Sequence, residues 1–122
     1  MKRKILIVDD ETDIVQLLTD MLTEDGYCVF SAKNVREFKE CAFAEKPDLI
    51  ILDIMLGQDN GAQAYSALVA EGFDRNVPVI FLSALAEGHT AKAATGRTYA
   101  LHTKPFQYDS LLQDINCLTR AA

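Results

Sequence analysis

A chain of 122 residues is long enough to bury a hydrophobic core and has the length of one domain. Its composition, 49% hydrophobic and 25% charged, is typical of a globular protein and argues against a disordered chain. The formal net charge of -6 argues against direct binding to a nucleic-acid backbone, which is recognised by clustered Lys and Arg side chains.

The sequence carries no signal for membrane insertion or secretion. No apolar run approaches the roughly 20 residues that cross a bilayer, and the short apolar run 5–8 is followed at once by acidic residues, unlike a signal peptide. Cys28, Cys41 and Cys117 match no metal-binding spacing and are expected to be reduced thiols. We therefore expect a cytoplasmic protein.

Short, nearly all-apolar runs alternate along the chain with longer segments whose apolar residues recur every three or four positions. The runs are typical of strands buried on both faces of a parallel sheet, and the longer segments are typical of helices that cover it. In chain order, we expect strand 4–8, helix 14–22, strand 28–32, helix 35–42, strand 49–52, loop 57–61, helix 64–69, strand 78–82, a short or irregular helix 86–96, strand 99–102 and helix 108–118. This alternation predicts an α/β fold, a doubly wound parallel sheet with helices on both faces.

Polar side chains stand at the carboxyl ends of four of these expected strands. They are Asp9 and Asp10 after the first strand, Asp53 after the third, Ser83 after the fourth and Lys104 after the fifth. In a doubly wound sheet the carboxyl ends of the strands share one rim, where ligands bind. We therefore expect these five side chains to converge on one crevice.

Three carboxylates in one crevice repel one another, by roughly 3 to 4 kcal/mol for each pair at about 4 to 5 Å and an effective dielectric constant of about 20. A hard divalent cation relieves this repulsion, and Mg²⁺ prefers oxygen ligands. With the ammonium group of Lys104, the set suits phosphoryl transfer to a nucleophilic carboxylate. Asp53, at the tip of the most central strand, is the best nucleophile. Asp9 and Asp10 are then metal-side residues, and Ser83 could donate its hydroxyl to a phosphoryl oxygen.

Each of these residues, taken alone, has an ordinary structural explanation. Asp9 or Asp10 could cap the first helix, and Asp53 could be a turn residue. Ser83 could be a polar loop residue, and Lys104 could be a solvated surface lysine. The functional hypothesis rests on their joint placement at strand ends.

The chain resembles the receiver domain of response regulators over essentially its whole length. Each matching piece is short, and the order and spacing of the pieces make the resemblance specific. They are ILIVDDE at 5–11, PDLIILDIML at 47–56, Gly61, PVIFLSA at 78–84 and KPF at 104–106. The resemblance implies a flavodoxin-like (βα)5 fold with strand order 2-1-3-4-5, and a single receiver domain at 1–122 without an output domain.

The resemblance also implies a phosphoacceptor of a two-component system or phosphorelay. Asp53 would take a phosphoryl group from a phosphohistidine on a sensor histidine kinase or a histidine phosphotransfer protein. The domain would signal through contacts with an output protein that the sequence does not name, as a monomer or weak dimer. It would catalyse its own phosphorylation and dephosphorylation without being a turnover enzyme.

The same resemblance assigns roles around the metal. Mg²⁺ (or Mn²⁺) would be bound by Asp10, Asp53 and the backbone carbonyl of Met55. Asp9 would act through a metal-bound water, and Lys104 would pair with the phosphoryl group.

The switch residues depart from the family pattern. Ser83 would move toward the phosphoryl group, but the position three before the lysine, usually aromatic, is Leu101. Tyr99 lies two residues away on the same strand face and is the candidate substitute. The segment 85–98 is also shortened and interrupted by Gly, so we expect an atypical output partner.

Further departures surround the expected site. Gly57 stands where the family usually has Pro, so we expect greater backbone freedom after Asp53. Met55 and Leu85 occupy positions that in the family tune the attack of water on the acyl phosphate. Both side chains are apolar and cannot position a water, so we predict slow self-dephosphorylation.

The departures leave a second function open, that of a degenerate receiver that binds proteins without phosphorylation. A flavoprotein or a haloacid-dehalogenase-type phosphatase could share the fold. A flavin phosphate loop, however, needs glycines and donors where the acidic run 9–11 stands. The phosphatase motif needs a second Asp at the position of Met55.

Overall fold

The structure, a computed structural model, describes residues 2–83, 99–104 and 107–120. The elements within these ranges, in chain order, are β1 (Lys4–Val8), α1 (Thr12–Glu24), β2 (Cys28–Ala32), α2 (Val35–Glu45), β3 (Leu49–Asp53), β4 (Met55–Leu56), β5 (Asp59–Asn60), α3 (Gly61–Ala70), β6 (Val79–Ser83), β7 (Tyr99–Thr103) and α4 (Tyr108–Arg120). The helix expected at 86–96 lies outside the described residues.

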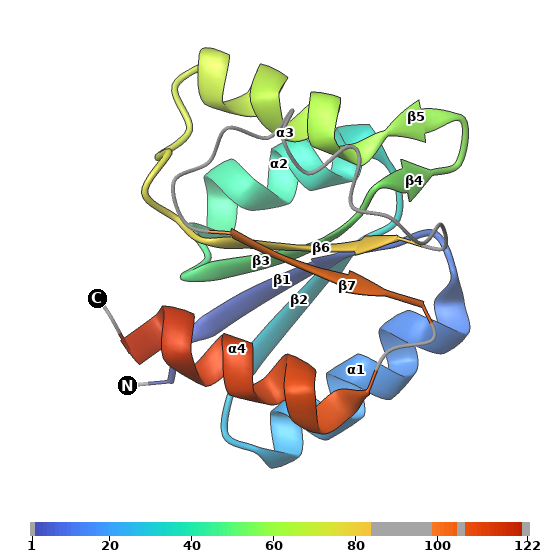
Figure 1. Cartoon of the computed structure of the whole chain (residues 1–122). Coiled ribbons are helices and arrows are strands. Elements are labelled where there is room, and N and C mark those ends of the chain that lie inside the picture. Colours follow the sequence, from blue (N-terminus) through green and yellow to red (C-terminus); the bar gives the residue numbers. More distant parts are fainter. Residues whose placement is uncertain (1, 84–98, 105–106, 121–122) are drawn as a thin grey trace.

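Five strands form one parallel sheet in the order β2-β1-β3-β6-β7. Helices α2 and α3 cover one face of this sheet, and α1 and α4 cover the other (Figure 1). The expected doubly wound α/β fold and its strand order are therefore confirmed. In such a sheet, all five strands direct their carboxyl ends to the same rim.

The central strands are apolar on both faces because both faces are covered. Every residue of β3 and of β6 is buried, and alternate residues point to opposite helical layers. One core cluster joins Leu6, Ile50 and Phe81 to Phe38 of α2 and Tyr65 of α3. The other core cluster lies between the sheet and helices α1 and α4, and consists of Ile5, Ile7, Leu18, Leu22, Tyr27, Leu49, Ile51, Ile80, Leu82, Leu111 and Ile115.

The segment after β3 differs from the expected loop over 57–61. Strands β4 and β5 pair as an antiparallel hairpin, in which Met55 faces Asn60 and Leu56 faces Asp59. Gly57, in the turn, has a φ of 64°, a left-handed conformation that glycine adopts without steric cost. Proline, whose φ is fixed near -65°, could not adopt this turn conformation.

Helix α3 begins directly behind the hairpin. The side chain of Asn60 accepts a hydrogen bond from the backbone of Gln63 at 3.0 Å and so caps the helix. The described part of the chain contains no helix that is long and apolar enough to cross a membrane.

Candidate functional site

The acidic residues meet because β1 and β3 are neighbours in the sheet. Val8 and Leu52 are register partners, so the residues that follow them, Asp9 and Asp53, leave the two strands side by side. Both side chains are buried, whereas Asp10 is exposed. One carboxylate oxygen from each of Asp9, Asp10 and Asp53 lies within 4.8 Å of the other two. The sequence predicted this convergence of the three carboxylates.

Asp9 is turned into the protein by its own loop. Its Oδ1 accepts a hydrogen bond from the backbone N–H of Glu11 at 2.9 Å. The residue that caps α1 is Glu11, whose side chain makes no capping hydrogen bond. Neither Asp9 nor Asp10 is therefore the N-cap of α1, and the alternative explanation for this pair is wrong.

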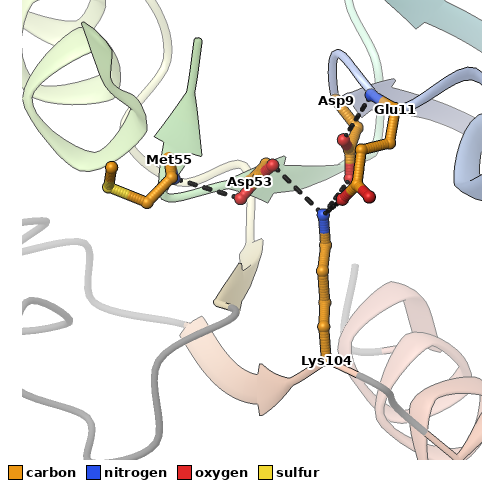
Figure 2. A network of polar contacts seen from close by, with 5 residues as sticks. All are labelled: Asp9, Glu11, Asp53, Met55 and Lys104. Carbon is orange, nitrogen blue, oxygen red and sulfur yellow. Dashed lines mark hydrogen bonds and ion pairs between the residues drawn. The ribbon is translucent and has the colours of Figure 1, made fainter. Parts of the chain in front are cut away.

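Lys104 enters the site from the end of β7, as Figure 2 shows. Its backbone N–H donates to the carbonyl of Ser83 at 2.7 Å, which holds the end of β7 against β6. Its Nζ lies 2.8 Å from Asp9 Oδ2, 3.1 Å from Asp53 Oδ2 and 2.5 Å from Glu11 Oε1. The lysine side chain is only 10% exposed, so it is not a solvated surface lysine.

The ammonium group of Lys104 is stabilised in its charged form. Burial by itself disfavours the charge, but the hydrogen bonds to Asp9 and Glu11 and the negative charges of Asp53 and Asp9 outweigh it. The pKa of Lys104 is consequently raised above its ordinary value. This side chain is therefore a permanent cation in the site at neutral pH.

Asp53 shows the opposite balance. Burial and, to a smaller extent, the charge of Asp9 raise the pKa of Asp53, and the net value is about 6. Lys104 and a hydrogen bond of 3.0 Å from the backbone N–H of Met55 to Oδ1 lower the pKa, but not enough to offset the burial. The carboxylates thus carry more negative charge than one ammonium group neutralises. Their hard oxygen atoms fit a Mg²⁺ ion, which would neutralise the remainder.

Gly61 allows the start of α3 to pack against Asp53. A Cβ atom at this position would lie 2.0 Å from the backbone oxygen of Asp53. The backbone N–H of Gly61 donates to the carbonyl of Ile54 at 2.6 Å, so this close approach is also hydrogen-bonded. A larger residue would push α3 and Asp53 apart.

The remaining expected site residues lie around this centre. Ser83 is buried at the end of β6, one residue beyond the register partner of Asp53. Met55 presents its backbone to Asp53, while its side chain is 49% exposed and points away from the lysine in Figure 2. Along β7, Tyr99 pairs with Val79 and Leu101 pairs with Phe81. The switch role of Tyr99 or Leu101 stays a prediction, and Leu85 lies outside the described residues.

Glu11 is the site residue that the sequence did not assign. Its carboxylate makes the shortest of the three contacts with Lys104, although 93 positions separate the two residues in the chain. The signal was present in the sequence as the third acid of the run Asp9-Asp10-Glu11. The role of Glu11 could not be assigned from the sequence, because it depends on where the ammonium group of Lys104 lies.

A flavodoxin-like parallel sheet with three carboxylates and a lysine at its carboxyl rim defines a class of phosphoryl-handling α/β domains. The chain matches the family described as "Response regulator receiver domain" over residues 5–116. It belongs to this family, whose members act in two-component and phosphorelay signalling.

Individual relatives agree with the family. The chain is 33% identical to Protein PilH of Pseudomonas aeruginosa over 118 residues, which are 94% of this chain and 96% of PilH. It is 30% identical to Sporulation initiation phosphotransferase F of Bacillus subtilis, with 91% of this chain and 89% of the relative covered. The solved structure of response regulator TrrA from Thermotoga maritima, in complex with Mg(2+)-BeF, superposes with a TM-score of 0.80 at 28% identity and covers 95% of this chain and 98% of TrrA.

Other curated relatives are longer proteins. The chain spans 28%, 46% and 25% of the length of three transcriptional regulators that it matches. The match to them therefore concerns their receiver domains and leaves their other activities aside.

Proposed function

We propose that this receiver domain accepts a phosphoryl group on Asp53 from a phosphohistidine, in a reaction that depends on Mg²⁺ or Mn²⁺. One observation carries the proposal. A buried carboxylate with a raised pKa lies between two further carboxylates and the ammonium group of Lys104. This arrangement has no structural benefit of its own, because buried like charges destabilise a fold.

The nucleophile is present in its reactive form. With a pKa of about 6, Asp53 is ionised at neutral pH. A carboxylate oxygen attacks phosphorus, the bond between phosphorus and the imidazole nitrogen breaks, and the histidine leaves as the acyl phosphate forms. The ammonium group of Lys104 faces Oδ2 and stabilises the negative charge that the phosphoryl oxygens bring. Ser83, at the end of the neighbouring strand, donates its hydroxyl to one of these oxygens.

The metal would be held by Asp10 and Asp53, by the backbone carbonyl of Met55, and by Asp9 through a water. Bound there, Mg²⁺ would neutralise charge on the phosphoryl oxygens during transfer. The proposal is supported by the three converging carboxylates and by the related TrrA structure, whose title names a Mg(2+)-BeF complex.

The proposed partners follow from the reaction. A sensor histidine kinase or a histidine phosphotransfer protein in the cytoplasm would supply the phosphoryl group, and an output protein would read the result. The relative named Sporulation initiation phosphotransferase F supports a relay role. The domain would be a signalling switch, monomeric or weakly dimeric, and not a turnover enzyme.

Incubation with Mg²⁺ and acetyl phosphate, followed by mass spectrometry, tests the proposal. We expect the mass to rise by one phosphoryl group in the native chain, and not in Asp53→Asn or after addition of EDTA. Peptide mapping should place the group on Asp53. An unmodified native chain under these conditions would instead favour a receiver that binds proteins without phosphorylation.

A further inference from the structure

The ammonium group of Lys104 neutralises two of the carboxylates that a cation would use. Its Nζ contacts Oδ2 of Asp9 and Oδ2 of Asp53, and both residues belong to the cluster that could hold a metal ion. Two cations at one pair of carboxylates repel each other. Binding of a divalent ion therefore requires that the ammonium group weakens these two contacts.

Glu11 offers the ammonium group a third partner. Its Oε1 lies 2.5 Å from Nζ, closer than either Asp9 at 2.8 Å or Asp53 at 3.1 Å. Glu11 is not part of the acidic cluster, and its side chain is 58% exposed. In Figure 2 its carboxylate lies on the Asp9 side of the ammonium group, away from Met55. Lys104 can thus keep its short ion pair with Glu11 while it moves away from the carboxylates of Asp9 and Asp53.

The backbone holds Glu11 in place for this role. Its N–H is bound to Asp9 Oδ1 at 2.9 Å, and its carbonyl accepts the hydrogen bond from Val15 N–H that opens α1. The side chain makes no capping bond, so its carboxylate is committed to Lys104. The residue is thereby fixed beside the site, with its charge directed at the lysine.

We propose that Glu11 is a positioning residue that draws Lys104 away from Asp9 and Asp53 and so raises the affinity of the site for Mg²⁺. Two effects act in the same direction. The ion pair with Glu11 removes a competing cation from Asp9 and Asp53. The negative charge of Glu11 also adds to the attraction for a divalent ion. The inference rests on the proposed function in assuming that the cation binds at the acidic cluster.

The test is a calorimetric titration of Mg²⁺ into the full chain and into two variants. Glu11→Gln removes the charge that contacts Lys104. Asp13→Asn is the matched control, because Asp13 is also an exposed acid and lies in the first turn of α1. We expect Glu11→Gln to weaken Mg²⁺ binding about fivefold, and Asp13→Asn by less than about twofold because only the long-range field changes. Equal effects of the two variants, or tighter binding by Glu11→Gln, would overturn the proposal.

A thermodynamic cycle with Lys104→Met separates the contact from the field. If Glu11 acts through the lysine, Glu11→Gln should weaken Mg²⁺ binding less in the Lys104→Met background than in the native chain, because only the field of its charge is then lost. An undiminished effect in that background would contradict a positioning role. Thermal unfolding of each variant checks the fold, and the pair Glu11→Gln and Asp13→Asn decides the point alone if Lys104→Met is too unstable to titrate.

The outcomes also separate this inference from the proposed function. A native chain that binds Mg²⁺ and is phosphorylated, with equal affinities in Glu11→Gln and Asp13→Asn, overturns the role of Glu11 alone. A native chain that binds no Mg²⁺ overturns both.

Discussion

Replacing Asp53 by Asn should stabilise the metal-free protein. Asn has nearly the shape of Asp and can still accept the hydrogen bond from Met55 N–H, but it carries no charge. The substitution removes the charge that burial and Asp9 disfavour. Lys104 keeps its ion pairs with Asp9 and Glu11, so it is not left as an unpaired buried cation.

The pKa of Asp53 gives the size of this effect. A rise from 3.8 to about 6 means that the folded protein disfavours the ionised form. At about 1.4 kcal/mol for each pH unit, the fold loses about 3 kcal/mol when Asp53 ionises. Asp53→Asn should recover most of this at pH 8, which corresponds to an increase in Tm of about 10 °C.

The direction of the pH dependence follows from the raised pKa. Between about pH 4 and pH 6 the folded protein holds a proton on Asp53 that the unfolded chain has lost. The free energy of unfolding of the native chain therefore falls as the pH rises through this window, and is then constant with respect to this group. The stability advantage of Asp53→Asn over the native chain should therefore increase between about pH 4 and pH 6.

Urea denaturation in EDTA at pH 4 and pH 8 measures both predictions. Mg²⁺ should then stabilise the native chain at pH 8 and affect Asp53→Asn much less, because a ligand of the folded state raises its stability by mass action. The reasoning would be refuted if Asp53→Asn were less stable than the native chain at pH 8 in EDTA. That result would mean that the ion pair with Lys104 outweighs the burial of the charge.

Three more predictions address other parts of the site. Gly61→Ala should lower the free energy of unfolding by at least about 2 kcal/mol in urea denaturation, because its Cβ would overlap the backbone oxygen of Asp53; unchanged stability would contradict the close packing of α3. Lys104→Met should raise the pKa of Asp53 above about 6, since the lysine lowers it. Carboxyl ¹³C shifts across a pH titration measure this pKa, and a lower pKa in the variant would contradict the prediction. Met55→Asn combined with Leu85→Glu should shorten the lifetime of the acyl phosphate after removal of phosphodonor, and an unchanged decay rate would contradict slow self-dephosphorylation.

The sequence was sufficient for the main sheet because its signal is strong and local. All-apolar runs such as Leu49 to Leu52 have few alternatives to a buried parallel strand. Once the strands were assigned, the polar residues that lie at their carboxyl ends were known. The convergence of Asp9, Asp10 and Asp53 was therefore predictable without coordinates.

The missed features depend on geometry that no local pattern carries. The hairpin consists of two-residue strands, too short to show a period, and its turn depends on the backbone conformation of Gly57. The partnership of Glu11 with Lys104 joins the start of α1 to the end of β7. Its existence depends on how far the lysine side chain reaches across the rim.

The site and the fold make opposite demands on the same charges. A core carboxylate such as Asp53 lowers stability when ionised, and Asp9 beside it increases that loss. A divalent cation can neutralise this excess charge of the carboxylates, and Lys104 can stabilise the negative charge of a phosphoryl group during transfer. Three carboxylates contact one ammonium group, and the carboxylate of Asp10 lies close to two of them, so the stability of the site improves when its ligands bind. Under the proposed function, metal binding should therefore stabilise the folded protein as well as prepare Asp53 for the reaction.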